Sequence, residues 1–131
     1  MEKSKIIIYW VTTILMSVGM FGTGLAQVIH SKQMIDIVIP LGYPLYFLNI
    51  IGVWKMLAVI VILIPGFKLV KEWAYAGLFF VMTGAVVSHL ASGDDSIKGI
   101  IGPLMQTVFI ILSWHFRPVN RKIIVPHARL V

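Results

Sequence analysis

Long apolar stretches separated by short polar ones dominate the pattern of this chain. Four stretches are almost wholly apolar and near the length of about 20 residues that a helix needs to cross a bilayer; they cover residues 6–29, 46–64, 73–91 and 99–116. None alternates as a strand does, and in lipid a backbone must satisfy its own polar groups, so all four are expected to be helical. The pattern predicts one transmembrane domain over residues 1–131, an all-α integral membrane four-helix bundle.

The helix-breaking residues between the apolar stretches agree with this division. Pro65-Gly66 ends the second stretch and Pro118 follows the fourth. In the long first loop, residues 34–39 are apolar enough to lie in the interface as a short helix or strap. Gly24-Leu25-Ala26 resembles a signal-peptide cleavage site, but the apolar run before it, at about 20 residues, exceeds the usual 7–15 and favours an uncleaved anchor.

Composition changes the picture by excluding classes of protein. Only 12% of the residues are charged, against about 25% in a soluble domain, so most of the outer surface must face lipid. There is no cysteine, which excludes disulfides, thiol redox chemistry and thiolate metal sites. The net charge of +6 comes from residues at the ends of the apolar stretches, so it indicates membrane topology and not nucleic-acid binding.

The distribution of basic residues predicts the orientation. Eight lysines and arginines lie in the N-terminus, the second loop and the C-terminal tail, whereas only Lys32 and Lys98 lie in the first and third loops. Because cytoplasmic segments carry the excess of basic residues, both termini are expected in the cytoplasm. The expected location is the inner (cell) membrane, which the chain crosses several times.

Lys55 is the candidate functional residue with the strongest claim. It is the one Asp, Glu, Lys or Arg within the four stretches, and a lysine at the centre of a span costs roughly 2.5–3.5 kcal/mol on insertion scales. Its compensation can come from deprotonation, from carbonyl and side-chain oxygens, from an outer-loop aspartate, or from a bound ligand. The alternative is a side chain that snorkels along lipid to the headgroups.

Other polar residues of the spans gather toward the same outer half. A ligand pocket is therefore hypothesised from Lys55, His89, Gln27, Asn49 and Ser88. Side chains tilt toward the N-terminus of their own helix, so Lys55 leans outward and His89 leans inward, and the two can meet directly or through water. Taken alone, a histidine near a helix end is more often interfacial or capped. The spacing of the histidines predicts no metal site, and no residues indicate catalysis.

Small residues mark possible packing faces on two of the spans. Gly19 and Thr23 lie four apart on the first, and Gly77, Gly84 and Ser88 mark one side of the third. Small residues let helix backbones approach closely in a membrane. The pattern favours a tight bundle, with a homo-oligomeric face on the first span as the alternative.

Several segments together resemble the DoxX-like family of small bacterial membrane proteins. The resemblance covers most of the chain and is carried by residues 41–44, 51–57, 64–66, 71–77, 84–85 and 88–89. It implies a four-helix membrane bundle, with Gly42-Tyr43-Pro44, Lys55, Glu72-Trp73-Ala74 and Ser88-His89 as signature positions. The wider group is named for a subunit associated with a thiosulfate:quinone oxidoreductase, and eukaryotic relatives act in assembly or trafficking of membrane proteins.

Three functions follow as hypotheses from the residues and the resemblance. The first is a non-catalytic accessory protein of membrane redox metabolism, which binds a quinone or a lipid near Lys55 and His89. The second is a subunit of a quinone-linked oxidoreductase, with a soluble redox protein as partner. The third is a scaffold or assembly factor, in which the glycine faces matter more than Lys55. No cofactor is evident beyond a possible quinone, and a transporter is a weaker fourth option.

Overall fold

The computed structural model describes residues 2–93 and 97–123, and all regular structure in them is helical. In chain order the helices are α1 (Lys3–Val28), α2 (Lys32–Leu41), α3 (Tyr46–Leu63), α4 (Lys68–Ala91), α5 (Ile97–His115) and the short 3-10 helix η1 (Val119–Arg121). All the α-helices except α2 are long and apolar enough to cross a membrane. The four predicted spans are therefore confirmed as helices, and the fold is all-α.

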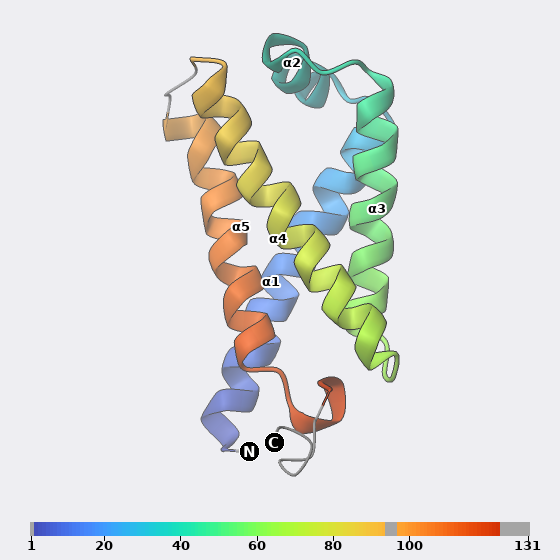
Figure 1. Cartoon of the computed structure of the whole chain (residues 1–131), viewed down its shortest axis with the longest axis vertical. Coiled ribbons are helices and arrows are strands. Elements are labelled where there is room, and N and C mark those ends of the chain that lie inside the picture. The colour runs from blue at the N-terminus through green and yellow to red at the C-terminus, as the bar shows by residue number, and fades with distance from the viewer. Residues whose placement is uncertain (1, 94–96, 124–131) are drawn as a thin grey trace, which may run out of the picture.

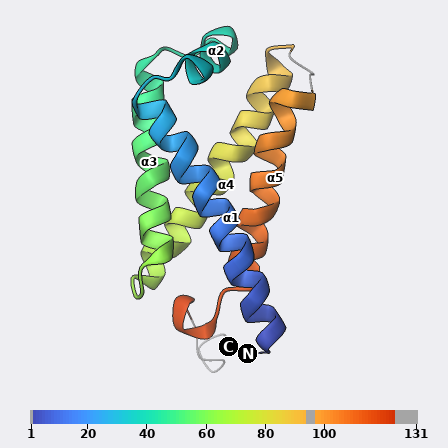
Figure 2. The same cartoon turned by 180° about the vertical axis from the view of Figure 1, so that it is seen from behind.

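The four long helices run up and down between two unlike ends (Figures 1 and 2). α2 lies across one of them, which we call the α2 end. The start of α1, the α3–α4 turn and η1 gather at the other, which we call the basic end. Helix α4 runs beside α3 on one side and α5 on the other, and α1 crosses behind them. Successive long helices are thus antiparallel neighbours; the connections from α3 to α4 and from α4 to α5 are short, and the one from α1 to α3 contains α2.

The predicted interface segment is a short helix. Ser31 starts α2 by accepting a hydrogen bond from the Met34 amide at 3.4 Å, and Gly42 ends it at a φ of +91°. Val38 is the one buried residue of α2. Since α2 contributes so little to the core, it lies across the end of the four long helices and is not part of their interior.

The core lies where α1, α3, α4 and α5 meet. It consists of Met16, Met20, Val59, Ile62, Tyr75, Leu78, Met82 and Ile110. Large apolar side chains also cover the outside, among them Val18 at 70% exposed and Phe80 at 68%. Exposed apolar residues all around the bundle are what lipid, and not water, accepts as a neighbour.

The charged residues at the start of α4 are helical, although the predicted span began only at Trp73. α4 begins at Lys68 and includes Lys71 and Glu72. A membrane span predicted from hydropathy stops at charged residues. The helix itself continues through them, because a charged side chain does not prevent the backbone hydrogen bonds. This extra turn brings Lys71 and Glu72 into the polar contacts of the basic end.

One pair of glycines lets the backbones of α1 and α3 touch. A Cβ built on Gly52 of α3 would lie 2.5 Å from the carbonyl oxygen of Gly24 on α1, and one built on Gly24 would lie 3.0 Å from the oxygen of Gly52. By contrast, a Cβ at Gly77 or Gly84 would meet nothing within 4 Å. The prediction that Gly77 and Gly84 permit close packing inside the bundle is wrong, because both are exposed and neither lies against another helix.

Candidate functional site around Lys55

Lys55 lies at the middle of α3 and points into the protein. It is nine residues from the first residue of α3, Tyr46, and eight from the last, Leu63. Its side chain is only 3% exposed, so it does not snorkel along the lipid-facing surface. A lysine at this depth must find its hydrogen-bond acceptors within the protein or in a ligand.

Two side chains of α1 accept hydrogen bonds from the lysine. The Lys55 Nζ donates to Thr23 Oγ1 at 2.7 Å and to Gln27 Oε1 at 3.3 Å. Thr23 and Gln27 lie four residues apart, so they occupy the same face of α1. Both acceptors are uncharged, and no carboxylate of the described residues forms an ion pair with Lys55. An ammonium has three N–H donors, so two acceptors leave one donor for another group.

The Gly24–Gly52 contact makes this arrangement possible. Gly52 precedes Lys55 by three residues on one face of α3, and Gly24 lies directly after Thr23. Because neither glycine has a side chain, α1 and α3 touch through their backbones at this height. The close approach brings the acceptors on α1 within reach of the lysine.

The other predicted site residues are distributed over separate contacts. Asn49 Oδ1 accepts a hydrogen bond from His30 Nε2 at 2.7 Å, and both residues lie toward the α2 end. Ser88 is paired with the Tyr43 hydroxyl at 2.6 Å. His89 is buried on α4 beside Ser88. The structure therefore brings Gln27 to Lys55, and the meeting of Lys55 with His89 stays a prediction.

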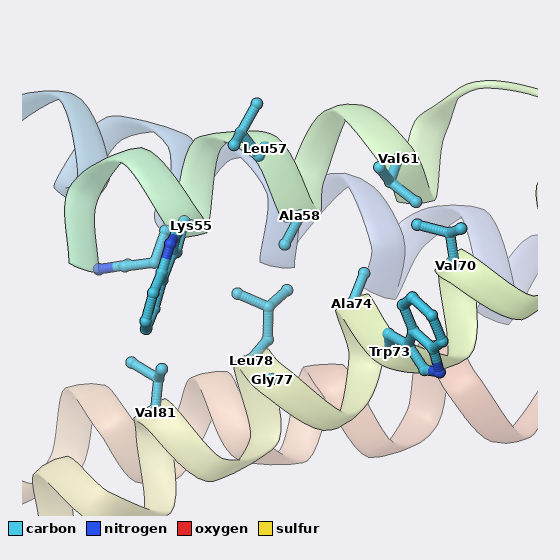
Figure 3. A pocket seen from close by; sticks show the side chains of 11 residues that line it. Lys55, Leu57, Ala58, Val61, Val70, Trp73, Ala74, Gly77, Leu78 and Val81 are labelled. Atoms are coloured by element: carbon cyan, nitrogen blue, oxygen red, sulfur yellow. The ribbon is translucent and has the colours of Figure 1, made fainter. Parts of the chain in front are cut away.

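An apolar groove of about 530 Å³ runs between α3 and α4 on the basic side of Lys55. Ala58 and Val61 line it from α3, and Val70 and Gly77 line it from α4 (Figure 3). Lys55 contributes its aliphatic stem, while its nitrogen points toward the start of α3 and away from Val61 and Val70. The groove is suited to a hydrocarbon chain, and Lys55 lies at the end of the groove that is farther from the basic end.

The comparison with known protein families supplies the identity that geometry alone does not. The family model described as the DoxX-like family matches residues 11–116. The chain belongs to the DoxX-like family. No curated protein and no solved structure gave a match. With its four apolar helices, the chain is a multi-pass membrane protein.

Two segments that carried the DoxX-like resemblance meet in the structure. Tyr43, from the Gly-Tyr-Pro segment after α2, is hydrogen-bonded to Ser88, from the Ser-His segment of α4. The Tyr43 ring also stacks on Phe47 at 4.4 Å between centroids. The pair ties the α2–α3 connection to α4 across the α2 end. Sequence spacing gave no sign of this contact, since the residues are 45 positions apart.

A second buried lysine of this DoxX-like protein was missed by sequence reasoning. Lys71 is 1% exposed, and its Nζ donates to the carbonyl oxygens of Val61 and Ile64 at the end of α3. Arg121 of η1 adds bonds to the same turn, including one of 2.8 Å to the Ile62 oxygen. Cations at a helix C-terminus satisfy its free carbonyls and favour its dipole. Lys71 is therefore a capping residue and not a surface lysine.

Glu72 joins two helices at the basic end. Its Oε1 pairs with Arg117 Nη2 at 2.7 Å, and its Oε2 accepts a bond from Trp114 Nε1 at 2.9 Å. Arg117 and Trp114 stand at the end of α5, so Glu72 links α4 to α5. Deeper in the bundle, the Ser113 hydroxyl bonds Thr13 at 2.5 Å and Tyr75 at 2.8 Å.

The described residues offer no metal site. Across residues 2–93 and 97–123, no three His, Asp or Glu side chains lie close enough together to hold a metal ion. The chemistry that this site can perform is hydrogen bonding and charge stabilisation by Lys55, beside a groove for an apolar chain.

Proposed function

We propose that this protein binds a small amphipathic molecule inside the membrane, with Lys55 as the residue that holds the polar head. The ligand class is a quinone or a lipid whose head carries a carbonyl or an anionic oxygen. The protein acts as a non-catalytic accessory component of membrane redox metabolism. The observation that carries the proposal is the buried Lys55 side chain. Its Nζ has two uncharged acceptors in the protein and, when protonated, one further N–H.

Two features beside Lys55 support a ligand of this kind. The α3–α4 groove accepts a chain, and the stem of Lys55 forms part of its wall. Trp54 also lines the groove and is 61% exposed at mid-helix, although tryptophans in membrane proteins favour the interfaces. Its indole N–H has no acceptor among the residues described here. An oxygen-bearing head in the groove could therefore accept a hydrogen bond from the Trp54 indole on the lipid side of Lys55.

The proposed orientation places the basic end in the cytoplasm, in the inner membrane. The excess of lysine and arginine at that end supports it. In this orientation α2 and the Tyr43–Ser88 pair lie at the outer face, and the ligand lies at mid-depth, accessible from the bilayer between α3 and α4.

Native mass spectrometry of the gently solubilised protein, with extraction of bound small molecules, tests the proposal. We expect a stoichiometric quinone or lipid on the wild type and at least about a tenfold loss of affinity in Lys55→Met, since a hydrogen bond to a charged group contributes roughly 1.5–3 kcal/mol. Methionine removes a costly buried charge, so the variant should fold at least as well as the wild type. Lys32→Met, at an exposed lysine, is the matched control. Equal ligand retention by both variants would exclude Lys55 as the head-binding residue.

A scaffold or assembly function is the second candidate, and the outward glycines of α4 favour it. Gly77 and Gly84 are both exposed, lie seven residues apart and have open space around them. Leucine at either position should therefore leave the fold intact. If a partner helix packs there, Gly84→Leu should abolish co-purification of that partner, while Lys55→Met should not. Gly84 is the position to test because it does not line the α3–α4 groove, whereas Gly77 does. The reverse result would support the ligand-binding proposal.

A further inference from the structure

A second groove, of about 410 Å³, lies between α4 and α5. Its walls are apolar over most of their length, with Ala76 and Phe79 on α4 and Ile110 and Ile111 on α5. From Glu72 to Phe80, which both line it, α4 rises about 12 Å. The groove therefore covers a large part of one leaflet's hydrocarbon depth. Glu72 and Trp114 line its end nearest the basic end, which we call its mouth.

The mouth of this groove carries a charged pair. Glu72 and Trp114 line the groove directly, and Arg117 reaches Glu72 from beyond the end of α5 at 2.7 Å. The Glu72 side chain is 25% exposed and that of Arg117 is 12% exposed. The Arg117 guanidinium also lies 4.6 Å from the centre of the Trp114 ring. A carboxylate, a guanidinium and an indole thus stand together at the level where headgroups lie.

An acid at this end of the molecule is unusual. Among the described residues, this end has two acids, Glu2 and Glu72. It has seven basic residues, which are Lys3, Lys5, Lys68, Lys71, Arg117, Arg121 and Lys122. Glu72 alone of the two acids faces an apolar groove. Lys68 precedes it by four residues on the same face of α4 and is exposed. The groove mouth therefore presents one anionic group between cationic ones.

We propose that the α4–α5 groove is a binding site for an aminophospholipid of the phosphatidylethanolamine type. One acyl chain lies between Phe79 and Ile111, the primary ammonium of the head donates to Glu72, and the phosphate lies against Lys68 and Arg117. The site is separate from the Lys55 site and does not rest on the function proposed above.

The charges at the mouth select this head over the other common ones. A phosphatidylglycerol head has no cation for Glu72, so the carboxylate is left facing an anion. A phosphatidylcholine head has a cation but no N–H, so it forms no hydrogen bond with the carboxylate. A primary ammonium forms a charge-assisted hydrogen bond, which is the stronger kind.

Lipid retention measured by native mass spectrometry tests the site. The delipidated full chain is offered ethanolamine, choline or glycerol phospholipids with identical acyl chains. We expect the ethanolamine lipid to be retained about tenfold more tightly than the other two, the factor that one good charge-assisted hydrogen bond supplies. Glu72→Gln keeps an acceptor for Trp114 but loses the charge, and it should reduce the preference to about twofold. Glu2→Gln, at the other acid of the basic end, should keep it.

A second variant tests whether the groove binds the acyl chain of the lipid, independently of its headgroup. Ala76→Phe fills the groove from α4 and should lower retention of all three lipids, whereas Ala91→Phe, near the opposite end of the same helix, should not. No head preference in the wild type, an unchanged preference in Glu72→Gln, or full retention by Ala76→Phe would each overturn the proposal.

Discussion

Replacing Gly52 with alanine is expected to destabilise the protein by about 1–3 kcal/mol, the usual cost of overpacking. The new Cβ would lie 2.5 Å from the Gly24 carbonyl oxygen and 2.8 Å from Val28 Cγ2. A backbone oxygen cannot rotate away as a flexible side chain can, so α1 and α3 must separate. Thermal unfolding in detergent, followed by circular dichroism, should show a lower midpoint.

The same change is expected to loosen Lys55 from Thr23 and Gln27, because the glycine contact sets their distance. Ligand retention should therefore fall together with stability. Gly22→Ala is the matched control on α1, since a Cβ there would meet nothing within 4 Å. Its midpoint should stay the same or rise slightly, as alanine favours helix over glycine. If Gly52→Ala and Gly22→Ala unfold alike, the α1–α3 backbone contact is not what holds the two helices.

Replacing Lys71 with methionine is expected to have the larger effect on folding. The amide that would normally bond the Val61 oxygen belongs to the residue four positions later, Pro65, which has no N–H. Lys71 supplies the missing donor to Val61 and bonds Ile64 as well. Each buried carbonyl left without a donor costs about 1–3 kcal/mol. The free energy of unfolding should therefore fall by several times the thermal energy, and the unfolding midpoint should fall with it.

Lys68→Met provides the control for Lys71→Met. Lys68 is exposed and begins the same helix, so its loss should change stability little. The measurement is again the unfolding midpoint, here of delipidated protein in detergent, so that the lipid site proposed beside Lys68 does not contribute. A Lys71→Met protein as stable as Lys68→Met would show that water or Arg121 satisfies the end of α3 without the lysine.

The sequence pattern was sufficient for the long helices and insufficient for their rotations. Runs of apolar residues predict spans because length and hydropathy are local properties. The inward face of each span is not readable in the same way, since lipid-facing and core-facing positions are both apolar. For that reason the exposed faces of Gly77 and Gly84 were misassigned, and the contact between Gly24 and Gly52 was not foreseen.

The candidate site shows the same division between local and non-local information. A solitary lysine inside an apolar run is visible in sequence, and Lys55 is buried as that position implies. Its acceptors are not visible, because Thr23 and Gln27 are common polar residues 32 and 28 positions away. The burial of Lys71 is not visible either, because it lies outside the apolar stretches and adjoins the charged residues Lys68 and Glu72. Only the turn of the chain at Pro65-Gly66 brings it back onto α3.

The hydrogen bonds of the two buried lysines have a consequence for synthesis of the protein. Lys55 bonds to residues of α1, and Lys71 bonds to residues of α3, so every acceptor precedes its lysine in the chain. When the ribosome delivers each lysine to the membrane, the segment that will receive it has already been made. Neither lysine needs α5 in order to form these hydrogen bonds. The two buried lysines can thus find their acceptors in the order in which they enter the bilayer, before the whole chain has been inserted.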